Sequence, residues 1–172
     1  MAIIRLFHAF LFAVLLGTLG VISASFAQDE IGLYFDTAGS VNCLTDSVTF
    51  PQSVDVFLVL KNCSSPDGIA GWEGALTLSE GCFLTAADLG PQALNVATPP
   101  EYIVGLGTPI LYAPEMVIAR FTLFFTGPGE IYLHAPEINS IEGELGPVYV
   151  TPGDSGRLTA MRYSFGSPVH PV

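Results

Sequence analysis

The sequence predicts an all-β fold, a two-sheet antiparallel jelly-roll sandwich of about nine strands. Short runs of β-branched and aromatic residues recur along the chain, and each is followed by Gly, Pro, Asn or Asp. No stretch keeps apolar residues at the three- and four-residue spacing of an amphipathic helix. Half of the 172 residues are hydrophobic, which is enough to bury one core. Because no crossover helices are expected, neighbouring strands should pair antiparallel.

The first segment, residues 1–27, has the features of a secretory signal peptide. Arg5 supplies a positive start, Leu6 to Ile22 is almost purely apolar, and Ser25-Phe26-Ala27 places small residues before a polar stretch. Cleavage is expected after Ala27, which predicts a secreted or periplasmic protein without a membrane anchor. An uncleaved anchor is the alternative, but the apolar run is short for a full span.

The domain is expected to cover residues 28–165, and its strands follow from the apolar runs and their turn residues. We predict strands at Ile31–Asp36, Val54–Lys61, Ile69–Leu78, Ala93–Ala97, Tyr102–Gly105, Glu115–Thr126, Glu130–His134, Val148–Val150 and Arg157–Phe165.

Three connecting segments carry their own predictions. Thr85–Leu89 fits one helical turn capped by Thr85. Gly127-Pro128-Gly129 is typical of a hairpin turn between two paired strands. The Pro-rich tail Gly166–Val172 is expected to be flexible.

Alternation along the strands assigns their faces. Val54–Lys61 is apolar on both faces and should be a central strand. In the strand at Ile69–Leu78, Trp72 should face the core, whereas Glu73 and Thr77 should face water. In Glu115–Thr126, one set should face the core, namely Val117, Ala119, Phe121, Leu123 and Phe125. The opposite set gives the candidate binding face, namely Met116, Ile118, Arg120 and Phe124.

Two stretches carry a family resemblance. One is Val54-Asp-Val-Phe-Leu-Val-Leu-Lys-Asn62 followed by Gly68-Ile-Ala-Gly-Trp72, and the other is Val117-Ile-Ala-Arg-Phe-Thr-Leu-Phe-Phe125 followed by Glu130-Ile-Tyr-Leu-His134. Together they resemble cohesin-like domains, secreted β-sandwiches that are also similar to carbohydrate-binding modules. The resemblance implies a nine-strand jelly roll and weakly implies recognition of dockerins. Leu78-Ser79 stands where the family often has Tyr-Asp, and no binding residue of the family maps onto a single position.

The cysteines number three, so an exported chain leaves at least one of them without an intramolecular partner. Cys43 precedes the strand at Val54–Lys61 and Cys63 follows it. Cys82 follows the next strand, which should run antiparallel to it. We therefore expect a Cys43–Cys82 disulfide at one end of the sandwich and a free thiol at Cys63. Three reduced thiols are the alternative.

The charge and the sparse histidines restrict the function. The net charge is −11, with 16 acidic and 5 basic side chains, so a nucleic-acid partner is excluded. His134 and His170 with scattered cysteines predict no zinc site and no cofactor. The abundant carboxylates would allow a weak structural calcium site, although no run of closely spaced aspartates is present.

Three segments contain residue types used in catalysis, and none of them predicts an enzyme. Gly153-Asp154-Ser155-Gly156 and Asp36-Thr37-Ala38-Gly39 are similar to protease motifs, but each is explained by a turn. The acidic cluster Glu137, Glu142 and Glu144 after His134 would suit glycoside hydrolysis, yet a solvated loop explains it as well.

The function predicted from the sequence is therefore an exported, non-catalytic binding module. Protein–protein interaction, with a partner or with a second copy, is the first hypothesis. A carbohydrate-binding module is the second, with polysaccharide stacking on exposed rings. Its candidate rings are Trp72, Tyr102, Tyr112, Tyr132, Tyr149 and Tyr163. A structural subunit of an extracellular assembly, built by strand exchange, is the third.

Overall fold

A computed structural model of the chain describes residues 28–44, 49–143, 146–164 and 169–171. The predicted signal peptide, residues 1–27, lies outside the described residues. Twelve strands and no helix are present in these ranges, so none of the described segments is a helix that could span a membrane. The strands are β1 Glu30–Tyr34, β2 Gln52–Lys61, β3 Ile69–Leu78, β4 Cys82–Asp88, β5 Ala93–Asn95, β6 Glu101–Ile110, β7 Glu115–Phe125, β8 Glu130–His134, β9 Val148–Thr151, β10 Asp154–Ala160, β11 Arg162–Tyr163 and β12 Val169–Pro171.

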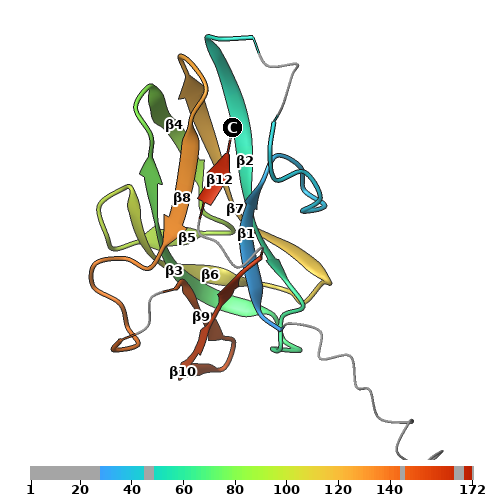
Figure 1. Ribbon diagram of the computed structural model, residues 1–172. Coiled ribbons are helices and arrows are strands. Elements are labelled where there is room, and N and C mark those ends of the chain that lie inside the picture. The colour runs from blue at the N-terminus through green and yellow to red at the C-terminus, as the bar shows by residue number, and fades with distance from the viewer. Residues whose placement is uncertain (1–27, 45–48, 144–145, 165–168, 172) are drawn as a thin grey trace, which may run out of the picture.

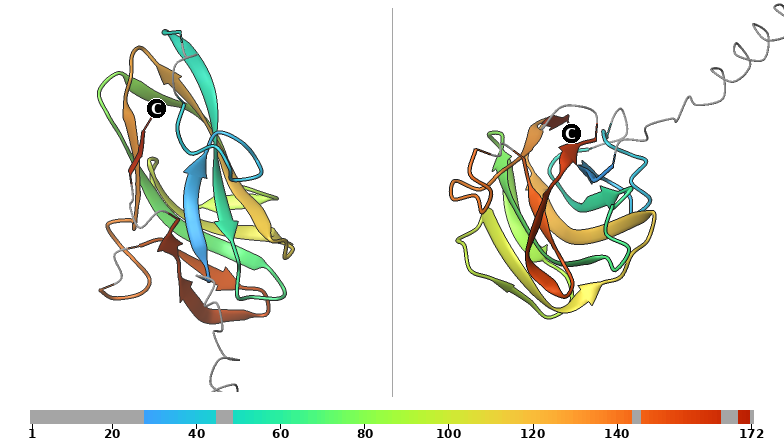
Figure 2. Two further views of the ribbon diagram at one scale, coloured as in Figure 1. Left: turned by 45° about the vertical axis from the view of Figure 1, so that its right-hand side comes forward. Right: turned by 90° about the horizontal axis from the view of Figure 1, so that it is seen from below.

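The strands form two sheets that pack face to face, and the predicted sandwich is confirmed (Figures 1 and 2). The five-stranded sheet has the order β11-β1-β2-β7-β4, so β2 is central as expected. The seven-stranded sheet has the order β10-β9-β3-β6-β5, with β8 also on β3 and β12 on β8. Every described pair is antiparallel except β1 with β11.

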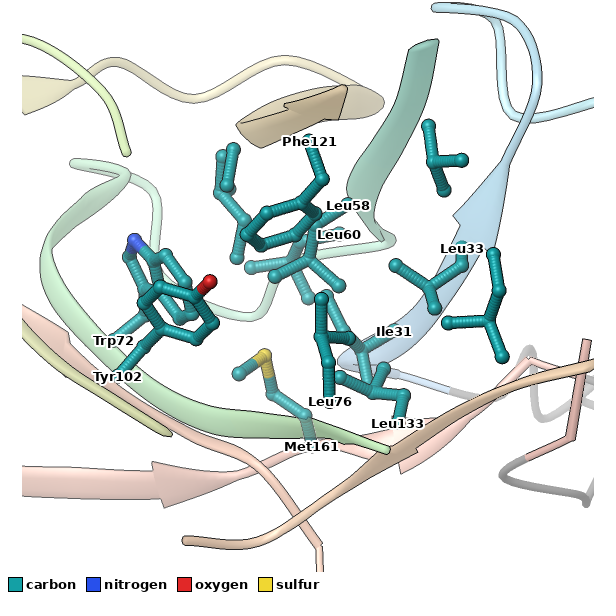
Figure 3. Close-up of a cluster of buried hydrophobic side chains, with 14 of the residues drawn as sticks. Ile31, Leu33, Leu58, Leu60, Trp72, Leu76, Tyr102, Phe121, Leu133 and Met161 are labelled. Atoms are coloured by element: carbon teal, nitrogen blue, oxygen red, sulfur yellow. The ribbon is translucent and has the colours of Figure 1, made fainter. Parts of the chain in front are cut away.

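The core lies between the two sheets and is filled by aromatic and branched side chains (Figure 3). Trp72 and Tyr102 come from the seven-stranded sheet, and Phe121 comes from the five-stranded sheet. The Tyr102 ring centroid lies 5.7 Å from that of Trp72 and 5.3 Å from that of Phe121. These tilted ring contacts add to the apolar area that the two sheets bury. Through these contacts, β3 and β6 of the seven-stranded sheet pack against β7 of the five-stranded sheet.

The Gly68-Ile-Ala-Gly71 segment has a steric reason for both of its glycines. Gly68 has a φ of 78°, and a Cβ there would stand 1.9 Å from the Ile110 carbonyl oxygen. A Cβ on Gly71 would stand 2.6 Å from the Val104 carbonyl oxygen. Any side chain would push the start of β3 away from β6. The two glycines therefore let β3 approach β6 at this corner of the sandwich.

The segment Thr85–Leu89 is not a helical turn, and that prediction was wrong. Strand β4 runs from Cys82 to Asp88 and pairs with β7 from Phe125 to Arg120, with a register shift between Leu84 and Ala86. The long strand β7 offers unpaired backbone groups along this edge. Pairing with it outweighs the weak helical preference of a short Ala-containing segment.

The turn Gly127–Gly129 does not close a hairpin, which corrects the second local prediction. Strand β7 belongs to the five-stranded sheet, whereas β8 belongs to the seven-stranded sheet. The connection therefore crosses the sandwich, and β8 is held there by Ser79. The Glu130 amide donates to Ser79 Oγ at 2.9 Å, and the Ser79 amide donates to the Glu130 carbonyl at 3.0 Å.

The end of the chain also differs from the prediction of a flexible tail. Residues 169–171 form β12 and pair antiparallel with Glu130–Tyr132 of β8. The strand predicted at Arg157–Phe165 is divided into β10 and β11, because the Met161 side chain turns into the core between them. Of the predicted tail, residues 166–168 and 172 lie outside the described residues.

Candidate functional site

The outer surface of β4, β7 and β2 carries a grid of side chains that stay open to solvent. Three cross-strand rows define it: Phe83 beside Phe124 and Ser53, Ala86 beside Thr122 and Asp55, and Asp88 beside Arg120 and Phe57. Phe83 is 54% exposed, and Phe57 and Phe124 are half-buried. We call the six larger or charged members of this grid the aromatic face, namely Asp55, Phe57, Phe83, Asp88, Arg120 and Phe124.

The charges on the aromatic face are loosely paired. Arg120 Nη1 lies 4.0 Å from Asp55 Oδ2, and Arg120 Nη2 lies 3.9 Å from Asp88 Oδ2. The Arg120 side chain is 51% exposed. Thr122 Oγ1 donates to Asp55 Oδ1 at 2.8 Å and fixes that carboxylate. Exposed ion pairs at this separation contribute little to stability, so Arg120 can exchange its partners for those of a bound molecule.

Two of the four residues predicted for the binding face, Met116 and Ile118, are buried in the core and only 2% and 1% exposed. The cause is a β-bulge in β7. Leu58 pairs with Ala119, but Val59 pairs with Val117, so Ile118 is an extra residue between them. One extra residue reverses the alternation before it. Met116 therefore points inward, whereas Arg120 and Phe124 remain outside.

The outer surface of β3 is covered, and Glu73 is buried there instead of facing water as predicted. Glu73 is 6% exposed. Its carboxylate accepts hydrogen bonds from the Ser140 amide, at 3.0 Å, and from the Ser140 hydroxyl. Glu101 Oε1 accepts from the Glu137 amide at 3.1 Å. The two carboxylates thus tie the connection between β8 and β9 across the sheet.

The same connection encloses a hollow of about 590 Å³, lined by His134, Glu137 and Glu142 among others. The His134 ring already has two partners, with Nε2 2.9 Å from Thr77 Oγ1 and Nδ1 2.7 Å from the Ala135 carbonyl oxygen. Glu144, the third acid of the predicted cluster, lies outside the described residues. No arrangement here identifies an acid and a base for hydrolysis.

A buried polar cluster holds the start of the domain. The Asp29 carboxylate accepts from the Ser64 amide and from the Tyr149 hydroxyl, both at 2.8 Å. The Asp29 amide donates to the Asn62 carbonyl at 3.1 Å, and the Arg162 amide donates to the Asp29 carbonyl at 2.8 Å. We call this set the Asp29 latch. Burial raises the pKa of Tyr149 above its ordinary value.

The cysteines are not paired, and the predicted Cys43–Cys82 disulfide is absent from the structure. Cys82 begins β4, whereas Cys43 follows Val41, whose carbonyl accepts from Phe35 just beyond β1. Strands β2 and β7 lie between β1 and β4, so β1 and β4 are three strand spacings apart, or about 14 Å. A disulfide needs Cα atoms within about 7 Å, so this separation is too large for the bond.

The two buried thiols, those of Cys63 and Cys82, have a low reactivity because they are shielded from solvent. Cys63 and Cys82 are buried, and Cys43 is half-buried. Burial raises the pKa of Cys63 and raises the pKa of Cys82 to about 11. Thiolate is the reactive form, so neither buried thiol has the character of a nucleophile.

The segment Asp36-Thr37-Ala38-Gly39, which is similar to a protease motif, forms a turn, as predicted. The Asp36 carboxylate accepts from the Ser40 amide at 2.8 Å, from the Val41 amide at 2.9 Å and from the Ser40 hydroxyl. These hydrogen bonds, that of the Ser40 hydroxyl first, lower the pKa of Asp36. The second motif, at Asp154, lies at the β9–β10 turn and the start of β10. Asp36 thus shapes a turn and offers no free carboxylate.

The rings predicted to stack on sugars separate into three groups by their exposure. Trp72, Tyr102 and Tyr149 lie in the core and are at most 1% exposed. Tyr132 and Tyr163 are half-buried, and a hydrogen bond to Glu130 raises the pKa of Tyr132. Tyr112 is 50% exposed. It lines a groove of about 630 Å³ formed by Pro66, Asp67, Pro109, Leu111, Tyr112, Pro152 and Gly153.

Within the described residues, no group of three or more His, Cys, Asp or Glu side chains is arranged to hold a metal ion. Comparison of the sequence with known protein families and with curated proteins finds no match. The site therefore rests on the geometry of this chain alone.

The aromatic face includes residues that the sequence reasoning missed. Asp55 and Phe57 alternate with Val56 and Leu58 of β2, so the period of two already placed them on one outer face. Phe83 and Asp88 were missed because β4 was not predicted as a strand. The position of β4 beside β7 has no signal in the local sequence.

Proposed function

We propose that the chain is an exported, non-catalytic binding module that recognises a protein partner through the aromatic face. The observation that carries the proposal is the open grid around Arg120, in which Phe83 is 54% exposed. Aromatic residues and Arg are enriched in protein interfaces and in their energetic hot spots. The loose pairs of Arg120 with Asp55 and Asp88 leave its guanidinium available to a partner.

The cohesin-like resemblance agrees with this proposal, because it implies recognition of a protein partner. The strong negative charge favours a partner that is neutral or basic.

The test uses a photo-reactive phenylalanine analogue at position 83 of the secreted chain, and the same group at position 94 as the matched control. Leu94 is 67% exposed but lies on β5 of the other sheet. Exported proteins of the source organism are crosslinked, and a partner captured from position 83 alone is purified and titrated.

The titration then measures the effect of single substitutions on the affinity. Arg120→Glu and Phe83→Ser should each weaken binding at least about tenfold. Leu94→Ser should leave the affinity unchanged. Equal binding by all three variants would show that the partner meets another surface, and the proposal would fail.

A second candidate function is supported by the groove at Tyr112. An exposed ring beside three prolines suits the apolar face of a sugar, and the Asp67 carboxylate suits its hydroxyl groups. A screen of polysaccharides by affinity electrophoresis tests this candidate. Retardation that Tyr112→Ala abolishes and Phe83→Ser preserves would support it, and the absence of any retardation would reject it.

A further inference from the structure

The edge of β8 is closed by the chain's own last residues. On one side, β8 pairs with Ala75–Leu78 of β3. On its other side, Tyr132 pairs with Val169, Ile131 with His170, and Glu130 with Pro171 (Figure 1). Without β12, the backbone groups of Glu130–Tyr132 on that side would form an open sheet edge. Such an edge is a template for any extended segment.

The connection of β12 to the rest of the fold differs from that of its neighbours in sequence. Strand β11 lies beside β1 in the five-stranded sheet, and the Ser164 amide donates to the Ile31 carbonyl at 2.8 Å. Strand β12 lies in the opposite sheet and pairs with β8 alone among the described strands. Its release would therefore leave every other described strand pair in place.

We propose that the β8 edge accepts the C-terminal strand of a second copy, so that two or more molecules associate by exchanging β12. This deepens the assembly hypothesis and uses a surface distinct from the aromatic face. The binding partner is inferred to be a second copy, because β12 of the same chain already pairs with this edge of β8. Every copy carries the same tail and the same edge, so the exchanged pairing keeps the register Val169 with Tyr132 and Pro171 with Glu130.

The balance between the two arrangements depends on protein concentration. The same backbone hydrogen bonds form whether β12 comes from the same copy or from another. The intramolecular arrangement is favoured by the high effective concentration of a tethered strand. Exchange is therefore expected to increase as the protein is concentrated.

The experiment is a disulfide trap between two variants of the full-length chain, both secreted and both carrying Cys43→Ser. One carries Tyr132→Cys and the other carries Val169→Cys, and they are mixed, concentrated and oxidised. Opposed residues of an antiparallel pair lie about 4.5–5.5 Å apart between Cα atoms, within reach of a disulfide. A mixed dimer forms readily only when β12 of one copy lies on β8 of the other.

The matched control replaces Tyr132→Cys by Thr77→Cys, because Thr77 pairs with Tyr132 from the far side of β8. Position 77 is then about 10 Å from an exchanged Val169, beyond the reach of a disulfide. The mixed dimer should form at least about fivefold faster with position 132 than with position 77. Equal rates, or dimers that join position 132 only to itself, would overturn the proposal.

A second measurement keeps the proposal testable if the trap perturbs the strand. The unmodified chain and a chain ending at Ser164 are compared by light scattering over a hundredfold range of concentration. The unmodified chain should gain a dimer at high concentration, and the shortened chain, which lacks the strand that is exchanged, should associate less. Association of both to the same extent would overturn strand exchange, while binding to a different protein at the aromatic face would be unaffected.

Discussion

The outer surfaces of the two sheets differ in their access to solvent. On the five-stranded sheet, Phe83 and Arg120 are about half exposed over β4 and β7. On the seven-stranded sheet, Glu73 of β3 is 6% exposed, because the β8–β9 connection lies across it. A phenylalanine is thus open and a carboxylate is buried, the reverse of what the two side chains prefer.

The difference shows that connections, rather than strands, decide which outer surface is available for binding. The Glu73 carboxylate is stabilised in its buried position by two hydrogen bonds from Ser140. Burial of a charge needs such partners. Among the described residues, no comparable set of donors holds a connection over the aromatic face, where the carboxylates of Asp55 and Asp88 flank Arg120 at about 4 Å.

The largest effect is expected where the core meets the aromatic face on one strand. Phe121 is 1% exposed and Phe124, three residues later on β7, is half-buried. Phe121→Ala should lower the free energy of unfolding by about 3–5 kcal/mol, and Phe124→Ala by about 1 kcal/mol. Urea unfolding followed by the fluorescence of Trp72, the single tryptophan, measures both. Equal losses would mean that the aromatic face is a part of the core.

An intermediate effect is expected from the carboxylates of the two outer surfaces. Glu73→Ala should lower the free energy of unfolding by about 2 kcal/mol, because it removes hydrogen bonds to a buried charged group. Asp88→Ala should change it by less than about 0.5 kcal/mol, because an exposed ion pair contributes little. The same urea titration compares them at neutral pH. If Asp88→Ala were the more damaging change, the contrast between the surfaces would be wrong.

The smallest effect is expected at Asp36, whose carboxylate accepts hydrogen bonds within the turn that follows β1. Hydrogen bonds, that from the Ser40 hydroxyl first, lower the pKa of the Asp36 carboxyl below its ordinary value of 3.8 in the folded state. Its contribution to stability is therefore present above pH 3.8 and is lost as the pH falls through the lowered pKa. Asp36→Asn should be less stable than the unmodified chain at neutral pH, by much less than Glu73→Ala.

The pH series for Asp36→Asn supplies its own control. The difference in unfolding free energy from the unmodified chain should shrink to nothing on acidification, because the Asp36 carboxyl is then protonated as well. A difference that stays constant from pH 7 to pH 2.5 would show that the turn does not depend on the charge.

The strands were largely predictable because their alternation is local. Runs such as Ile69–Leu78 and Glu130–His134 matched β3 and β8 to the residue. The pairing of the strands was harder to predict from the sequence. The Gly127–Gly129 turn has the chemistry of a hairpin, yet it joins two different sheets. Turn residues fix the local backbone angles, whereas the sheet that receives the next strand is chosen by packing across the core.

The candidate site was half predictable for the same reason. Arg120 and Phe124 follow the bulge in β7 and keep the expected alternation, whereas Met116 and Ile118 precede it and are inverted. A bulge arises from the pairing of two strands and leaves no mark in either sequence alone. The burial of Glu73 likewise depends on Ser140, which lies 67 residues away. The cysteine pairing failed because it considered only the end of the sandwich at which each cysteine lies, whereas β2 and β7 separate β1 from β4.

The Asp29 latch has a mechanical consequence. A load applied at Gln28 reaches β1 through hydrogen bonds to Asn62, Ser64, Tyr149 and Arg162, and β1 itself lies between β2 and β11. These bonds share the force and must break together. A load applied at β12 meets, among the described residues, the three residue pairs that join β12 to β8. Tension across the molecule would therefore peel the C-terminal strand first, leaving the sandwich intact and the β8 edge open.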